Sequence, residues 1–164
     1  MSNAAAPLSN SAVEAEIPAD AAAVEALVLA AFGPGRFAKT AERLREQAGI
    51  AAGFVVREEG RVIGSVRLWR IAVGDTAALF LGPIAVDAAS RRVGLGADLV
   101  AACIERARTV GTSGILLVGD PPYFSRFGFE AAPGARLPGP VDQRRVMWLP
   151  VSDEAPSGMT RPVA

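Results

Sequence analysis

Histidine is missing from the sequence, and cysteine occurs once, at Cys103. Without histidine the chain cannot form Ser-His or Cys-His nucleophile pairs, and it lacks the commonest side-chain ligand of transition metals. A single cysteine excludes an intrachain disulfide and any cysteine-rich metal site. Cys103 falls on the apolar side of an expected helix, so we expect a core residue there and not a nucleophile. No resident metal is expected.

Net charge and long hydrophobic runs are missing as well. The chain has 17 basic and 17 acidic residues, and this balance argues against a general binder of nucleic acid or of anionic membranes. No apolar run approaches the roughly 20 residues that span a bilayer, and no basic segment followed by an apolar one marks a secretory signal. We therefore expect a cytoplasmic protein. All but one of the basic residues are arginine, the exception being Lys39. This bias is typical of genome composition, so no single arginine stands out.

The chain length of 164 residues suits one domain with a sizeable core. Residues 1–12 are small and polar, and we expect them to be disordered. The domain is predicted over residues 13–151. Residues 152–164 form a polar C-terminal tail in which little would fix the chain.

Two helices are predicted near the start of the domain. After a short strand at 13–17, Asp20 is a plausible N-cap, and an apolar face follows at helical spacing, ending at Ala31 and Phe32. A second helix is expected over about 38–47, and its charged residues indicate a solvated surface. The link from Phe32 to Phe37 is a candidate lining for a substrate entrance.

The middle of the chain predicts an antiparallel meander followed by a crossover. Strands are expected at 53–57, 62–72 and 77–86, and Gly82-Pro83 predicts a bend in the third. A helix over about 94–110 and a continuous apolar run at 114–119 then imply a right-handed crossover and a parallel strand pair. The expected fold is a mixed α/β sheet, mostly antiparallel with one parallel pair, and with helices on both faces.

One stretch carries a candidate binding site. The strand that ends at Val86 runs into a turn with Arg91 and Arg92, then into Gly94-Leu95-Gly96 and the helix. The first N–H groups of a helix have no intrahelical partner and favour an anion, and glycine lets a phosphate approach closely. The same glycines would also suit a tight turn that binds nothing, and the arginines a solvated turn. The pattern is not a Walker loop, and Leu99 stands where a dinucleotide fingerprint has its third glycine.

A second segment makes the pattern specific. Tyr123-Phe124-Ser125-Arg126-Phe127-Gly128-Phe129 follows one strand later and is predicted to be a short helix that ends at Gly128. Together with Arg91-x-x-Gly94-x-Gly96 and with Leu81-Gly82-Pro83-Ile84-Ala85-Val86, it resembles the GCN5-related N-acetyltransferases, most closely the small bacterial YhbS-like acetyltransferases. The order of elements matches from about Val13 to Val151.

The resemblance implies a site for acetyl-CoA as co-substrate. The pyrophosphate would lie on the turn and the helix start, and the pantetheine arm along the strand before them, where a backbone amide would polarise the thioester carbonyl. The implied contacts are Ile84, Ala85, Val86, Arg91, Arg92, Val93, Gly94, Leu95, Gly96, Ala97 and Phe124.

The acid and the base of the reaction are less well defined. In the family, a tyrosine four residues before the glycine of Gly-Phe is placed to protonate the departing thiolate, but here that position is Phe124. Tyr123, the only tyrosine, is the candidate catalytic residue, with a packing role as the alternative. In that alternative, water or Ser125 protonates the thiolate, or no protonation is needed. The third strand offers no Glu as base. The remaining candidates for the base are Glu58, Glu59, Asp75, Asp87, Asp120 and Glu130, none of which stands out. Capping is the default role for Asp87 and Asp120.

The predicted activity is direct transfer of an acetyl group from acetyl-CoA to a primary amine in a ternary complex. The alternative is an acyl-CoA-binding sensor or interaction module with little or no transferase activity. A weaker alternative is transfer to a hydroxyl or thiol, or of a longer acyl group. We expect an unidentified amine acceptor, no nucleic acid or membrane partner, and a monomer or homodimer.

Overall fold

A computed structural model describes residues 13–35, 39–90 and 92–164. Within these residues one mixed sheet runs through the molecule, with its strands in the order β1-β2-β3-β4-β6-β9-β7. Strands β5 and β10 pair with β3, and β8 pairs with β10. All described pairs in this main order are antiparallel except β4 with β6. The predicted fold class is therefore confirmed.

The first half of the sheet is a meander of four strands. They are β1 (Val13–Ala15), β2 (Ile50–Glu58), β3 (Arg61–Val73) and β4 (Thr76–Leu81). Glu59 and Gly60 join β2 to β3 and both have positive φ, the backbone of a tight hairpin turn. β3 is long because its alternating apolar residues face cores on both sides of the sheet. It consequently pairs with β4 and β10 at one end and with β5 at the other.

The predicted bend lies between β4 and β5 (Ala85–Val86). The Gly82-Pro83 peptide bond is cis, and Gly82 has a φ of 133°, which favours glycine. Both polar backbone groups of Gly82 point to β3: its N–H donates to the Arg67 carbonyl at 2.9 Å, and its carbonyl accepts from Trp69 Nε1 at 2.6 Å. The chain therefore turns toward β3 and resumes pairing there as β5.

The second half of the sheet contains the crossover. Helix α4 (Leu95–Val110) leads to β6 (Gly114–Val118), which lies parallel to β4. The chain then forms α5 (Pro121–Phe124), a 3-10 turn η3 (Ser125–Phe127) and β7 (Glu130–Ala131). A further 3-10 turn, η4 (Gln143–Arg145), precedes β9 (Val146–Pro150), which pairs antiparallel with β6.

The C-terminal segment is held in the sheet. β10 (Gly158–Pro162) pairs antiparallel with β3 and parallel with β8 (Ala135–Arg136). Thr160 in β10 is buried. The expectation that little would fix the chain after Ser152 was therefore wrong, because β3 extends far enough to pair with this strand.

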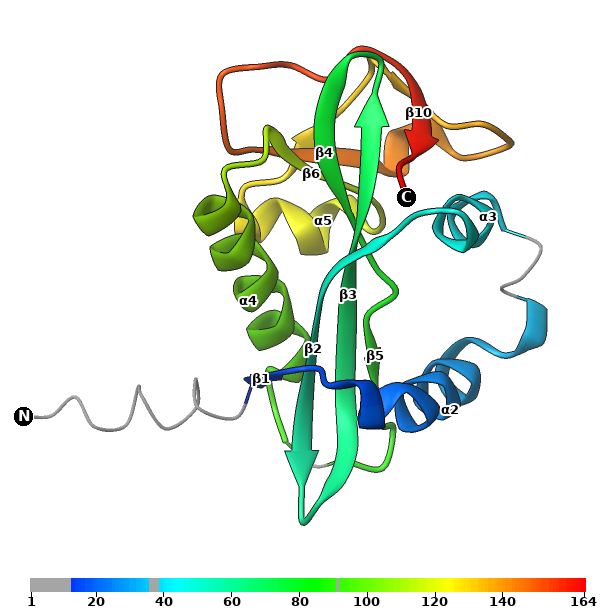
Figure 1. Ribbon diagram of the computed structural model, residues 1–164, viewed down its shortest axis with the longest axis vertical. Helices are drawn as coiled ribbons and strands as arrows, with labels where there is room; N and C mark the ends of the chain where they lie inside the picture. The colour runs from blue at the N-terminus through cyan, green and yellow to red at the C-terminus, as the bar shows by residue number, and fades with distance from the viewer. Residues whose placement is uncertain (1–12, 36–38, 91) are drawn as a thin grey trace, which may run out of the picture.

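Helices cover both faces of the sheet, with α4 on one side and α2 and α3 on the other (Figure 1). A 3-10 turn, η1 (Pro18–Asp20), leads into α2 (Ala21–Phe32), and α3 is Thr40–Glu46. The main core lies between α4 and the sheet, and Cys103 is fully buried in it, as predicted. α2 buries Val24 and Val28, but Phe32 is 48% exposed, so the predicted apolar face ends before Ala31. None of the described helices is long and apolar enough to span a membrane.

Candidate functional site

A cavity of about 370 Å³ opens where β4 and β6 separate. The two strands pair only at Leu79 with Ile115 and at Phe80 with Leu116. Beyond this point the bend at Gly82 directs the segment after β4 toward β3, while β6 continues beside β9. The gap is consequently a product of the backbone path. Its lining consists of Phe32, Lys39, Ala41, Arg45, Phe80, Leu81, Gly82, Pro83, Ile84, Leu117, Val118, Gly119, Asp120, Phe124 and Arg145.

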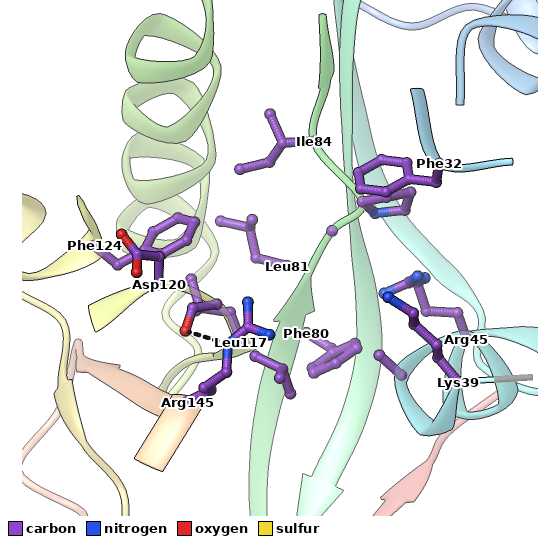
Figure 2. A pocket seen from close by; sticks show the side chains of 15 residues that line it. Phe32, Lys39, Arg45, Phe80, Leu81, Ile84, Leu117, Asp120, Phe124 and Arg145 are labelled. Atoms are coloured by element: carbon purple, nitrogen blue, oxygen red, sulfur yellow. Dashed lines mark hydrogen bonds between the residues drawn. The ribbon is translucent and has the colours of Figure 1, made fainter. Parts of the chain in front are cut away.

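The walls of the cavity are mainly apolar. Figure 2 shows Leu81, Ile84 and Phe124 on the side nearer α4, with Phe80 toward α3. The Phe124 ring packs over the backbone of Gly119, where a side chain would collide with the ring. The glycine at the end of β6 thus allows Phe124 to form part of the wall.

Charged groups line the rest of the cavity. Arg45 pairs with Glu42 at 3.1 Å and lies over the Phe80 ring. Arg145 donates its Nε–H to the Gly119 carbonyl at 3.1 Å, which fixes its guanidinium at the end of β6 (Figure 2). Lys39 reaches the cavity from the start of α3.

Asp120 is the only carboxylate among the lining residues that the structure describes. It occupies the N-cap position of α5, yet its side chain accepts no capping hydrogen bond, and only its carbonyl receives the N–H groups of Tyr123 and Phe124. Its carboxylate lies beside Phe124 (Figure 2). Asp120 therefore remains available to a bound molecule.

The start of α4 is open to an anion. Gly94 is at the N-cap with a φ of 82°, and no side chain of the described residues caps this helix. The preceding turn is held by Asp87, which accepts from the Ala89 N–H at 2.9 Å and from Arg61 at 2.5 Å. These two bonds hold the pKa of Asp87 below its usual range. Asp87 thus has a turn-capping role, whereas the helix start itself suits an anion such as a phosphate group.

The predicted binding residues lie along one path. Ile84 lines the cavity, and Ala85 and Val86 form β5, which among the described strands pairs only with β3. The remaining predicted residues follow at the turn and the first turn of α4: Arg92, Val93, Gly94, Leu95, Gly96 and Ala97. Leu95 is buried in the core, so only its backbone faces the helix end. Arg91 lies outside the described residues.

Tyr123 and Phe124 point to different places. Phe124 lines the cavity, whereas Tyr123 does not. The Tyr123 ring packs against Phe127 and under Arg126, and its hydroxyl lies 3.2 Å from the position that a Cβ on Gly96 would take. The hydroxyl therefore approaches the first turn of α4.

Sequence reasoning missed most of the charged lining. The residues of 38–47 were interpreted as a solvated face, but Lys39 and Arg45 line the cavity. Arg145 gave no signal of its own. Arg145 directly precedes β9, and the pairing of β9 with β6 places Arg145 beside Gly119, at the end of β6. Phe32 was expected near a substrate entrance and does line the cavity.

Comparison with known proteins agrees with this geometry. The model of the Acetyltransferase (GNAT) family matches residues 22–129. The uncharacterized N-acetyltransferase YhbS of Escherichia coli K12 is 34% identical over 155 residues, which cover 90% of this chain and 92% of YhbS.

Solved structures of GNAT family proteins have the same fold as this chain. The structure of E. coli YhbS in complex with CoA has a TM-score of 0.78 at 28% identity and covers 92% of this chain and 88% of that one. A GNAT family acetyltransferase from Brucella melitensis in complex with acetyl-CoA has a TM-score of 0.73 at 26% identity, with coverage of 93% and 95%. From its sequence and its fold, the chain belongs to the GNAT family of N-acetyltransferases.

Proposed function

We propose that the protein transfers an acetyl group from acetyl-CoA to a primary amine, by direct attack in a ternary complex. The observation that carries this proposal is the cavity at the separation of β4 and β6, next to the uncapped start of α4. One feature suits a thioester and an acceptor, and the other suits the pyrophosphate of the same co-substrate. The complexes of YhbS with CoA and of the Brucella protein with acetyl-CoA support the choice of co-substrate.

The co-substrate is proposed to follow the path of the predicted binding residues. Its pyrophosphate would accept hydrogen bonds from backbone N–H groups between Arg92 and Ala97, with Arg91 or Arg92 adding charge. Its pantetheine amides would pair with the edge of β5 that faces away from β3. That edge is open among the described strands, which supports this placement. The thioester would then lie near Ile84 and Phe124 at the cavity.

In the proposed reaction, the amine nitrogen attacks the thioester carbonyl carbon and forms the new C–N bond. The C–S bond breaks, and its electron pair leaves on sulfur as a thiolate. Asp120, beside Phe124 in the cavity, accepts the proton that the amine loses. The thiolate takes its proton from water, because Tyr123, the predicted acid, does not line the cavity and its hydroxyl lies at the first turn of α4.

Binding of the co-substrate is tested with a pair of glycine variants. Acetyl-CoA at a hundredfold excess over its Kd should stabilise the protein by about 2.7 kcal/mol, measured by urea unfolding. Gly94→Glu should abolish this gain because it places a negative charge on the proposed phosphate site. Gly111→Glu is the matched control: Gly111 ends the same helix, with a φ of 77° against 82°, and both positions open to free space. Equal stabilisation of both variants would contradict the binding site.

Catalysis is tested by thiol release with a panel of amines. Asp120→Asn should lower kcat by about 100-fold or more, as expected for loss of a general base, while acetyl-CoA binding persists. Asp75→Asn, in the exposed turn between β3 and β4, is the control. Acetyl-CoA binding without thiol release for any amine would favour the alternative, a binding module. Turnover that appears only in Phe124→Tyr would strengthen that alternative, since Phe124 supplies no proton.

A further inference from the structure

Some charged side chains of the cavity form ion pairs within the protein and others do not, and the unpaired ones indicate which charges an acceptor would carry. Lys39, Arg45 and Arg145 line the cavity together with Asp120. The charge of Arg45 is matched by Glu42. Among the described residues, no carboxylate forms an ion pair with Lys39 or Arg145, and Asp120 pairs with neither. Two cations and one carboxylate therefore face the cavity with their charges unmatched.

A second cavity continues the same cationic surface. It has a volume of about 340 Å³ and shares Lys39, Ala41, Val118 and Arg145 with the first. Arg43 also lines the second cavity. The carboxylate in the lining of this cavity, Asp142, already forms an ion pair with Arg144 at 2.9 Å. Positive charge is thus concentrated where the two cavities meet, in a molecule whose net charge is zero.

Arg145 is held ready for an anion. Its Nε–H bond to Gly119 fixes the plane of the guanidinium and leaves the terminal nitrogens to donate to a ligand. In Figure 2 the Arg145 side chain lies across the cavity from Lys39, while Asp120 is on the same side as Phe124. Arg145 lies on that side too, but its guanidinium is directed into the cavity toward Lys39, so an anionic group can bind between the two cations and an ammonium group at Asp120.

We propose that the acceptor is a small zwitterion: a primary amine that also carries a carboxylate or phosphate, with an apolar body between the two groups. Lys39 and Arg145 hold the anion, Asp120 faces the amine, and Phe32 and Phe80 contact the apolar part. This assignment rests on the proposed function, because it names the acceptor for the same site. Lys39 and Arg145 are specificity-determining residues that contact the acceptor away from the reacting atoms.

The test compares acceptors that share an amine and differ in the anion. 4-(Aminomethyl)benzoate is paired with 4-(aminomethyl)benzamide, and 2-aminoethyl phosphate with ethanolamine. Thiol release should give a kcat/KM at least tenfold higher for the anionic member of one pair. The pair that shows the preference distinguishes a carboxylate acceptor from a phosphate acceptor. Equal rates within both pairs, or faster reaction of the neutral members, would overturn the proposal.

Variants then assign the preference to the two cations. Lys39→Gln and Arg145→Gln should each reduce the preference at least threefold, mainly through KM, while Arg145→Lys keeps part of it. Arg144→Gln is the matched control, since Arg144 is the neighbour of Arg145 but does not line the cavity. An equal reduction in Arg144→Gln would indicate a general charge effect and would overturn the assignment.

Failure of the proposed function can be distinguished from failure of this inference. Acetyl-CoA binding, measured by calorimetry on the same variants, reports on the co-substrate site alone. If no acceptor releases thiol, the same four acceptors are titrated into protein saturated with CoA. Tighter binding of the anionic members, lost in Arg145→Gln, supports the zwitterion site even when turnover is absent. Binding without any preference for the anion overturns it.

Discussion

Basic side chains have different surroundings in two regions of the molecule. Between β1, β2, β3 and α2, Arg57 pairs with Glu14 and Asp20, and Arg67 pairs with Glu16. At the cavity, Lys39 and Arg145 have no carboxylate partner among the described residues. In the first region the charges of the arginines are neutralised by carboxylates of the protein. In the second region the cations can pair with an anionic group of a ligand.

The difference shows how to interpret a chain whose basic residues are almost all arginine. Residue type carries no information there, but the balance of charge around each side chain does. The paired arginines hold β1 and η1 to β2 and β3, so replacing these arginines should lower the free energy of unfolding. The unmatched cations should act on the acceptor and leave the fold intact.

The largest effect on stability is expected at Arg67. The side chains of Arg67 and Glu16 are 12% and 11% exposed, and their closest N–O distance is 2.7 Å. Arg67→Gln would leave the Glu16 carboxylate largely buried without its cation, which should cost about 3 kcal/mol of the free energy of unfolding. Urea denaturation measures this loss. Arg161→Gln, at an exposed position of β10, is the control, and equal unfolding midpoints for the two variants would contradict the structural role.

A smaller effect with a pH signature is expected at Asp20. The Ile17 N–H and then Arg57 hold the pKa of Asp20 below its usual range. The folded state thus favours the ionised form, so this stabilisation is complete above the unfolded pKa of about 3.9 and is lost as the pH falls through the folded pKa. Asp20→Asn should therefore destabilise the protein at pH 7, by about 2 kcal/mol. The gap between variant and parent should shrink below about pH 3.9. A gap that does not change with pH would contradict the assignment.

The same contrast explains how far the sequence could predict the site. The turn and helix start follow β5 directly in the chain, so the proposed phosphate site could be predicted from a contiguous motif that ends in Gly94-x-Gly96. The proposed acceptor cavity combines Phe32, Lys39, Asp120 and Arg145, which only the tertiary fold brings together. No local pattern marks such a set.

Among the elements of the fold, the meander and the crossover were predictable because their apolar periodicity is strong. β10 was not, because Gly158–Pro162 contains glycine, proline and arginine and has little alternation. Its place depends on the length of β3, whose end at Ile71–Val73 pairs with it. Asp20 occupies the predicted N-cap position, but its side chain binds Ile17 and Arg57, because β2 brings an arginine within reach.

An intermediate effect is expected at Arg145, which has contacts of both kinds. Its Nε–H bond to Gly119 belongs to the fold, and the rest of its guanidinium faces the cavity. Arg145→Ala should cost about 1 kcal/mol of unfolding free energy, the usual contribution of one hydrogen bond. Thermal and urea unfolding measure this loss. Arg145→Lys keeps the charge but cannot reproduce the guanidinium bond, so it separates the structural part from the ligand part. Its stability should resemble that of Arg145→Ala, while it should keep part of the acceptor preference that Arg145→Ala loses.

The smallest effect on stability is expected at Lys39, the only lysine in the chain. Lys39 is exposed, and its carbonyl accepts from the Arg43 N–H, a backbone bond that any side chain allows. Lys39→Gln should therefore change the unfolding free energy by no more than about 0.5 kcal/mol, while it raises KM for an anionic acceptor. A loss above about 1 kcal/mol would mean that Lys39 is matched within the fold like Arg67. Such a loss would contradict the difference between the two regions, because the charge of Lys39 would then be matched by a group of the protein and not by the acceptor.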